Sequence, residues 1–194
     1  MIAPVEQSEC EALTELVSDR PDAIVLARYG RVPQVARFGV AGDAPERDAT
    51  IVVQSDRGEE LAVVLQVLPV GKSATDDPAI TGDVLRTATT NDLTVAREAA
   101  DKTEASWSDW LARAAKWNLQ LELVDLEQTL DGRLILYVLN DRGAETTRLA
   151  LLAAAGGFGV VHVQPVGAEG IVQESGGGGC GSGGCGSGGG CSTH

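Results

Sequence analysis

Short apolar runs dominate the first third of the chain. Polar or glycine-containing segments separate these runs, which are rich in β-branched side chains. Runs of this length with such boundaries are typical of β-strands. The pattern predicts four strands, over residues 24–29, 32–38, 50–55 and 60–68. We therefore expect an antiparallel β unit over residues 21–70, after a leader over residues 1–20.

Helical spacing replaces this pattern from about Asn91. Trp107, Trp110 and Trp117 recur at intervals that place all three on one stripe of a helix. An apolar stripe of this kind usually packs against the core of the protein. We therefore expect the three indole rings to cover a sheet rather than to form a ligand-binding aromatic box.

A β-hairpin, a helix and a last strand are predicted after this helix. An alternating run over residues 119–129 and an apolar run over residues 133–139 flank the turn dipeptide Asp131-Gly132. The second helix ends at Gly156-Gly157, because glycine readily ends a helix. Residues 160–163 form the last predicted strand.

The predicted fold class is α+β. From residue 60 onward the predicted order is β, α, β, β, α, β, which is the order of a split βαβ, ferredoxin-like arrangement. This arrangement follows the N-terminal antiparallel β unit. We place the α+β unit, with its helix and hairpin, at residues 71–167, and a flexible, disordered Gly/Cys-rich tail at residues 168–194.

The charge of the chain argues against direct binding of nucleic acid. Its 28 acidic residues outnumber its 15 basic residues, which gives a net charge of −13. Binding to a phosphate backbone needs lysine and arginine, so we expect no direct nucleic-acid binding and no binding to an anionic membrane. The N-terminus has neither the basic start nor the apolar run of a signal peptide. We therefore expect a cytoplasmic protein.

The tail carries the clearest candidate metal ligands. Cys180, Cys185, Cys191 and His194 could offer three thiolates and one imidazole, a set that suits zinc or an iron–sulfur cluster. The spacing lacks a tight Cys-x2-Cys pair, so flexible free thiols are the other interpretation. We expect Cys10, in the polar leader, to be unrelated to this set.

Two groups of charged residues remain open to more than one interpretation. Asp125, Glu127 and Asp131 alternate along the predicted hairpin, and paired carboxylates can serve acid–base chemistry. We favour a solvated face of an amphipathic strand for them. A second group, before the long helix, could be a capping and salt-bridge cluster or a partner-binding surface; its members are Arg86, Asp92 and Glu98.

Three segments resemble, in sequence and in order, motifs of the C-terminal domain of the polymerase-suppressor-protein family. They run from Val53 to Leu61, from Arg86 to Asp92 and from Leu123 to Tyr137. The bacterial members of this family include the YaaT (RicT) regulators of sporulation, competence and biofilm formation. Ser55 stands where the family motif has threonine.

The resemblance implies a non-catalytic regulatory or adaptor protein. Such a protein would act by protein–protein contacts in a cytoplasmic complex linked to RNA processing. It also implies that Cys180 and Cys185 belong to an iron–sulfur site shared within the complex, although Gly186 stands where the family has a further cysteine. The alternative is a metal- or redox-active protein, either a metalloenzyme or a thiol sensor, that uses the Cys/His tail.

Overall fold

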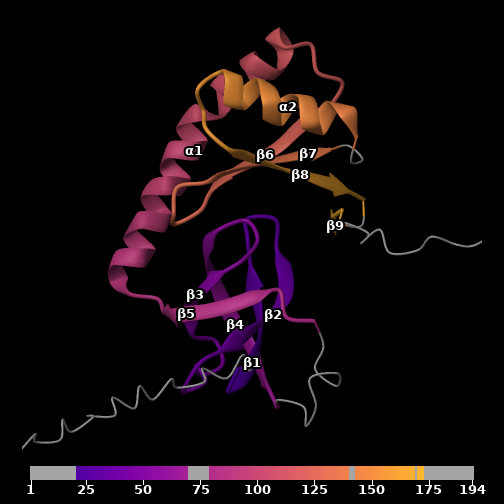
Figure 1. The fold of residues 1–194 in the computed structure, drawn as a ribbon. Coiled ribbons are helices and arrows are strands. Elements are labelled where there is room, and N and C mark those ends of the chain that lie inside the picture. The colour runs from indigo at the N-terminus through magenta and orange to yellow at the C-terminus, as the bar shows by residue number, and fades with distance from the viewer. Residues whose placement is uncertain (1–20, 70–78, 140–142, 169, 173–194) are drawn as a thin grey trace, which may run out of the picture.

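The computed structural model describes residues 21–69, 79–139, 143–168 and 170–172. Figure 1 shows two stacked units in these residues, a β-barrel below and a helix-covered sheet above, with a long helix rising from their junction. The predicted leader and residues 173–194 of the predicted tail lie outside the described residues. Neither helix of the described part has the length and apolar character of a membrane-spanning segment.

The lower unit is a closed barrel of five strands, which occur around the barrel in the order β1-β2-β5-β3-β4. Neighbouring strands are antiparallel except for β2 and β5. The bounds are β1 Ala23–Tyr29, β2 Gln34–Val40, β3 Thr50–Gln54, β4 Glu59–Leu68 and β5 Gly82–Thr87. The four strands predicted from the apolar runs are confirmed as β1 to β4.

The barrel closes because alternate side chains of its strands point into one core. Tyr29 and Phe38 meet edge to face there, with ring centroids 5.4 Å apart. The rest of the barrel core is aliphatic and consists of Val25, Ala27, Val40, Ile51, Val53, Ala62 and Val64. Small and β-branched side chains thus fill most of the barrel interior, and Tyr29 and Phe38 are the aromatic residues of this core cluster.

The fifth barrel strand was not predicted. In β5 only Val84 packs against the barrel core, and Leu85 is exposed, so the segment has no clear apolar pattern. Its first residue, Gly82, lies so close to β3 that a Cβ atom there would be 1.9 Å from the carbonyl oxygen of Gln54. Glycine therefore permits the close approach that inserts β5 between β2 and β3.

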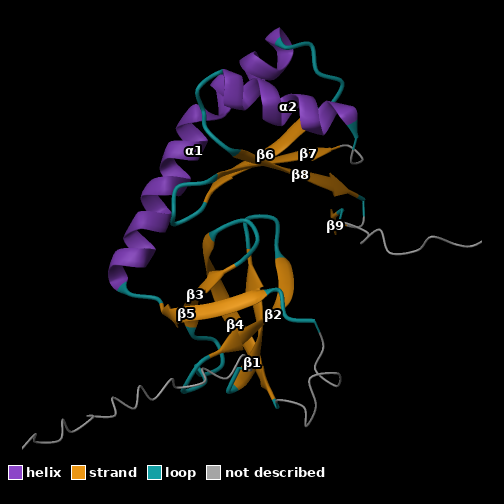
Figure 2. Cartoon of the chain, in the orientation of Figure 1, coloured by secondary structure: helices purple, strands orange, loops and turns teal. Residues whose placement is uncertain are grey.

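The upper unit consists of two helices and a four-stranded sheet in the order β6-β7-β8-β9 (Figure 2). Strands β7 and β8 are parallel and are connected through α2, whereas the other neighbours are antiparallel. The bounds are α1 Thr90–Lys116, β6 Glu122–Gln128, β7 Leu134–Leu139, α2 Ala144–Ala155, β8 Val161–Gly167 and β9 Gly170–Ile171.

The predicted tryptophan stripe is confirmed. Trp110 is buried in the core of the upper unit, and Trp107 and Trp117 pack against that core. The core joins α1 to α2 and to the sheet through Leu123, Leu126, Leu136, Val138, Leu149, Ala153 and Val161. The predicted Asp131-Gly132 turn is present between β6 and β7, and Gly132 has a φ of 86°.

The predicted ferredoxin-like arrangement is wrong. Its first strand, β4, belongs to the closed barrel, and the chain is mostly β, with two helices in its described residues. The first crossover is also missing, because α1 connects barrel strand β5 to β6 of the other sheet. Local alternation predicts that a segment is a strand, but it does not reveal which sheet that strand joins.

The start of α1 is fixed by a capping box. Thr89 accepts a hydrogen bond from the backbone N–H of Asp92, and the Asp92 carboxylate accepts one from the backbone N–H of Thr89. Arg86 of β5 also bonds to this carboxylate, at 2.6 Å. The bonds from Thr89, followed by the Arg86 charge, lower the pKa of Asp92. The predicted capping and salt-bridge cluster is confirmed for Arg86 and Asp92.

Candidate functional site

Arg57 lies in the turn between β3 and β4, at the end of the barrel that faces the upper unit. Its side chain is 2% exposed. The guanidinium pairs with the Glu60 carboxylate through Nη2 and donates from Nε to Glu60 Oε2 at 3.2 Å. The Ser55 hydroxyl donates to the same carboxylate oxygen. The tight turn thus buries an ion pair and supplies a further donor to it.

The same guanidinium extends to the upper unit. Arg57 Nη1 donates to the hydroxyl of Tyr137 in β7 at 2.7 Å, and this hydroxyl donates to Glu127 Oε2 in β6. Arg57 Nη1 also lies 4.0 Å from Glu127 Oε2. We call this set the Arg57 network; its members are Ser55, Arg57, Glu60, Glu127 and Tyr137.

Tyr137 meets Arg57 because both faces of β7 are buried. Leu136 and Val138 point to the helix-covered face, so the alternation of a strand turns Tyr137 and its neighbour Ile135 to the opposite face. Both residues on that face are fully buried. The face of the sheet that lacks helices therefore supplies Tyr137 to the network.

Burial and neighbouring charges shift the pKa values of three groups in the network. Burial lowers the pKa of Arg57, but the neighbouring Glu60, Tyr137 and Glu127 outweigh this and raise it, so the guanidinium stays charged. Burial raises the pKa of Glu60, while Arg57 and the Ser55 bond oppose the rise. Burial and the Glu127 charge raise the pKa of Tyr137, so its hydroxyl stays protonated and donates.

A second set of bonds surrounds the network. Arg31, in the turn between β1 and β2, donates its backbone N–H to Glu127 Oε1 at 3.0 Å and its Nε to Asp125 Oδ2 at 2.8 Å. The backbone N–H of Leu130 donates to the carbonyl of Glu59 at 2.8 Å. The β1–β2 turn and strand β4 are thereby bonded to β6 and to the turn that follows it.

The predicted solvated face of Asp125, Glu127 and Asp131 is only partly correct, because Asp125 and Asp131 keep solvent exposure whereas Glu127 is mostly buried. The first two bond to the barrel, as described above, and Asp131 pairs with Arg133 at 2.9 Å. A Cβ atom at Gly58, whose φ is 139°, would lie 2.6 Å from Asp131 Oδ1. The carboxylates therefore lie at the junction of the two units, where Glu127 is turned against the barrel and Asp125 and Asp131 border both the barrel and solvent.

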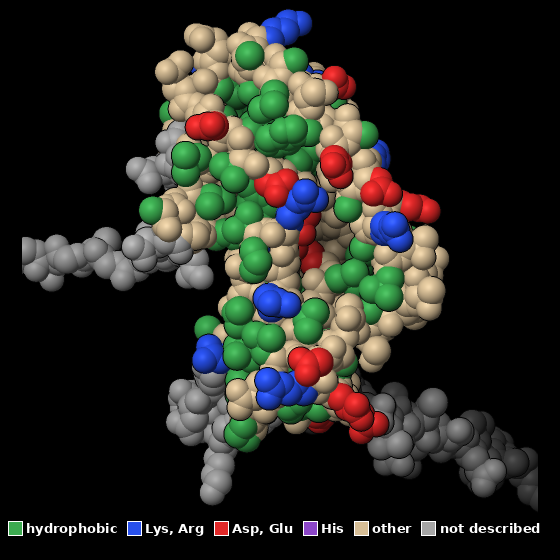
Figure 3. All heavy atoms as spheres, turned by 180° about the vertical axis from the view of Figure 1, so that it is seen from behind, with side chains coloured by type: hydrophobic (Ala, Val, Ile, Leu, Met, Phe, Trp, Pro, Cys, Tyr) green, Lys and Arg blue, Asp and Glu red, His purple; other side chains and the backbone are tan. Residues whose placement is uncertain are grey.

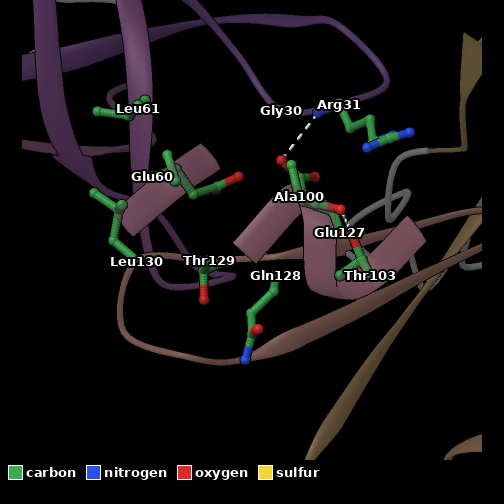
Figure 4. Close-up of a pocket in the computed structure, with 11 residues that line it drawn as sticks. Gly30, Arg31, Glu60, Leu61, Ala100, Thr103, Glu127, Gln128, Thr129 and Leu130 are labelled. Carbon is green, nitrogen blue, oxygen red and sulfur yellow. Dashed lines mark hydrogen bonds between the residues drawn. The ribbon is translucent and has the colours of Figure 1, made fainter. Parts of the chain in front are cut away.

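A pocket of about 280 Å³ opens beside the network (Figure 4). Glu60 and Leu61 of the barrel, Ala100 and Thr103 of α1, and the segment from Glu127 to Leu130 line it. Glu60 and Glu127 each accept hydrogen bonds at both carboxylate oxygens. A general base needs an oxygen that is available to a substrate proton. The geometry therefore favours a structural role for this carboxylate pair.

The predicted metal ligands Cys180, Cys185, Cys191 and His194 all lie outside the described residues. Among the residues that the structure does describe, no group of three or more His, Cys, Asp or Glu side chains could hold a metal ion. His162 is in β8, with Nε2 3.4 Å from Gln164 Oε1. Zinc or iron–sulfur binding by the tail therefore stays a prediction.

No family model, curated protein or solved structure matches this chain. The resemblance to the polymerase-suppressor C-terminal domain therefore stays a prediction. The structure shows which contacts the three segments of this resemblance make. The first contributes Arg57 and Glu60 to the network, the third contributes Glu127 and Tyr137, and the second caps α1. The first and third segments, which are distant in sequence, thus meet at the junction.

The sequence did not predict that Arg57 and Tyr137 belong to a buried network. An arginine in a turn is usually solvated, and a tyrosine within an apolar run usually serves the core. One signal was available, because Ser55, Arg57 and Glu60 bring a hydroxyl, a cation and an anion into one tight turn between two apolar strands. Nothing local indicated that the partner would be a tyrosine 80 residues away.

Replacing Arg57 tests the network. We expect Arg57→Met to lower the free energy of unfolding by about 3–5 kcal/mol, because Glu60 is left as an unpaired buried charge. The matched control is Arg133→Met, since Arg133 is 52% exposed and also pairs with a carboxylate. That control should change stability by at most about 1 kcal/mol. Urea denaturation followed by tryptophan fluorescence measures both, and equal effects would contradict the assignment.

Proposed function

We propose that this chain is a non-catalytic regulatory or adaptor protein, which acts by protein–protein contacts in a cytoplasmic complex linked to RNA processing. The observation that carries the proposal is the Arg57 network. In this network Arg57 pairs with Glu60 within the barrel and donates across the junction to Tyr137, which donates to Glu127. Side chains that are already hydrogen-bonded to one another are not available to a substrate, and we infer that they stabilise a scaffold for binding partner proteins.

The surface supports protein contacts over direct contacts with RNA. The net charge is −13, and the sequence resemblance that links the chain to RNA processing implies action through partner proteins. Figure 3 shows hydrophobic side chains over the upper unit and also over the barrel, with acidic and basic side chains around the junction and on the barrel. Large exposed apolar residues of the upper unit include Val124, Leu139, Leu151, Phe158 and Val160.

The exposed apolar residues around α2 test this proposal. Leu151 is 66% exposed and Val160 is 88% exposed, so we expect the double variant Leu151→Glu/Val160→Glu to leave the fold intact. It should abolish co-elution of the tagged chain with its partners in native gel filtration, because buried carboxylates disfavour an apolar interface. Val35→Glu is the matched control, since Val35 is 54% exposed on the barrel. Elution of the wild type as a free monomer would contradict the proposal.

The second candidate function is a metal- or redox-active protein, a metalloenzyme or a thiol sensor. The observation that favours it is the set of three cysteines and a histidine in the tail. In the adaptor proposal the same residues hold an iron–sulfur cluster or zinc that stabilises a complex. Either way, thiolates in a glycine-rich segment can gain on binding a metal the free energy that ordering the chain costs.

Anaerobic purification followed by zinc, iron and sulfide analysis tests the tail. We expect stoichiometric metal in the full chain and its loss in Cys180→Ser/Cys185→Ser, because a thiolate ligand binds far more tightly than a hydroxyl. The control is Cys10→Ser, which should keep the metal. Absence of zinc, iron and sulfide from the full chain would contradict a metal site. Turnover that depended on the bound metal would favour the second candidate over the adaptor.

A further inference from the structure

A second and larger hollow lies between the two units, away from the Glu60–Glu127 pocket. Its volume is about 650 Å³, which is within the range of small-molecule sites. The barrel contributes the β1–β2 hairpin, and the upper unit contributes β8 and β9. The polar side chains that matter for its chemistry are Gln34, Arg37, His162 and Gln164.

Two residues that line this hollow each carry a buried donor with no hydrogen-bond partner among the described residues. The donors are Nε2 of Gln34 and Nε of Arg37, both in β2. A buried N–H without an acceptor costs free energy, so most such groups in folded proteins are paired. The nitrogen of a side-chain amide and the nitrogens of a charged guanidinium donate hydrogen bonds and do not accept them. The lining therefore lacks acceptors for these donors, and since both atoms are closed to solvent, a ligand oxygen would reach them once the two side chains turn toward the hollow.

The charge balance indicates that the missing acceptor is an anion. Arg37 is permanently charged and makes no ion pair with a described residue. Arg57 also lines the hollow, but Glu60 already pairs with it. The carboxylate in the lining is Asp56, which is exposed to solvent and therefore screened. His162 can donate from Nε2 in one tautomer or in its charged form.

We propose that this hollow binds a small molecule that carries a carboxylate or a phosphate, whose oxygens accept hydrogen bonds from Arg37 and Gln34. Guanidinium groups bind both kinds of oxyanion through charge-assisted hydrogen bonds. A water molecule could accept from one donor, but it would leave the Arg37 charge unbalanced. Because β2 and β8 line the hollow together, the bound anion also contacts both units. This site is independent of the adaptor function proposed above.

The test uses the full chain and three probes: inorganic phosphate, succinate and the uncharged isostere succinamide. Isothermal titration calorimetry measures binding, and the ¹⁵N NMR signal of the Arg37 Nε–H reports contact with the donor. We expect phosphate or succinate to bind saturably and to shift this signal, while succinamide does neither. The anion that binds more tightly distinguishes a phosphorylated ligand from a carboxylic acid.

Substitutions then locate the site. Arg37→Gln should weaken binding of the preferred anion by about tenfold or more, because hydrogen bonds to charged groups are stronger than neutral ones. Arg47→Gln is the matched control, since it removes the same charge from an arginine that is 79% exposed, and it should bind as the wild type does. Gln34→Leu should weaken binding while leaving the net charge unchanged.

Three results would overturn the proposal. The first is the absence of saturable binding of either anion to the wild type, together with an unmoved Arg37 signal. The second is equal weakening by Arg37→Gln and Arg47→Gln, which would mean that only the net charge matters. The third is equal binding of succinate and succinamide, because a charged oxygen would then not be required. The wild-type NMR titration decides the matter even if a variant fails to fold.

Discussion

A buried guanidinium lies at the centre of the contacts that join the barrel to the upper unit. Arg57 is almost inaccessible to water, and its charge is balanced by Glu60 in its own unit and by Glu127 in the other. Placing an arginine in such a position costs several kcal/mol of desolvation unless excellent geometry offsets it. The Tyr137 hydroxyl accepts from Arg57 and donates to Glu127, so separating the units would leave both Arg57 and the Tyr137–Glu127 pair without their partner across the junction.

The remaining structure fixes the positions of the groups that meet there. The closed barrel holds the Ser55–Glu60 turn at its end, and the capping box at Thr89 starts α1 directly after β5. The tryptophan stripe of α1 then packs on the sheet whose opposite face carries Tyr137. The two hollows described above differ in chemistry, since the carboxylates that line one are already hydrogen-bonded and two residues that line the other carry donors without a partner.

Local pattern predicted those elements whose signal is local. Strands β1 to β4, the Trp110 face of α1, the Asp131-Gly132 turn and the helix end at Gly156 all follow from periodicity and turn chemistry. Strand β5 could not be predicted, because its place depends on the close approach of Gly82 to Gln54 and not on apolar residues. The ferredoxin-like order failed because sheet membership depends on long-range pairing. The residues of the site could not be predicted for the same reason, since Arg57 and Tyr137 are distant in sequence.

The measurement that tests the central role of Arg57 most directly is a double-mutant cycle with Arg57→Met and Tyr137→Phe. Urea denaturation of the wild type, both single variants and the double variant gives the coupling free energy across the junction. The account predicts a coupling of about 1–3 kcal/mol, because the two side chains share one charge-assisted bond in a buried network. Additivity of the two substitutions within about 0.5 kcal/mol would contradict it, since the two units would then be joined without this contact.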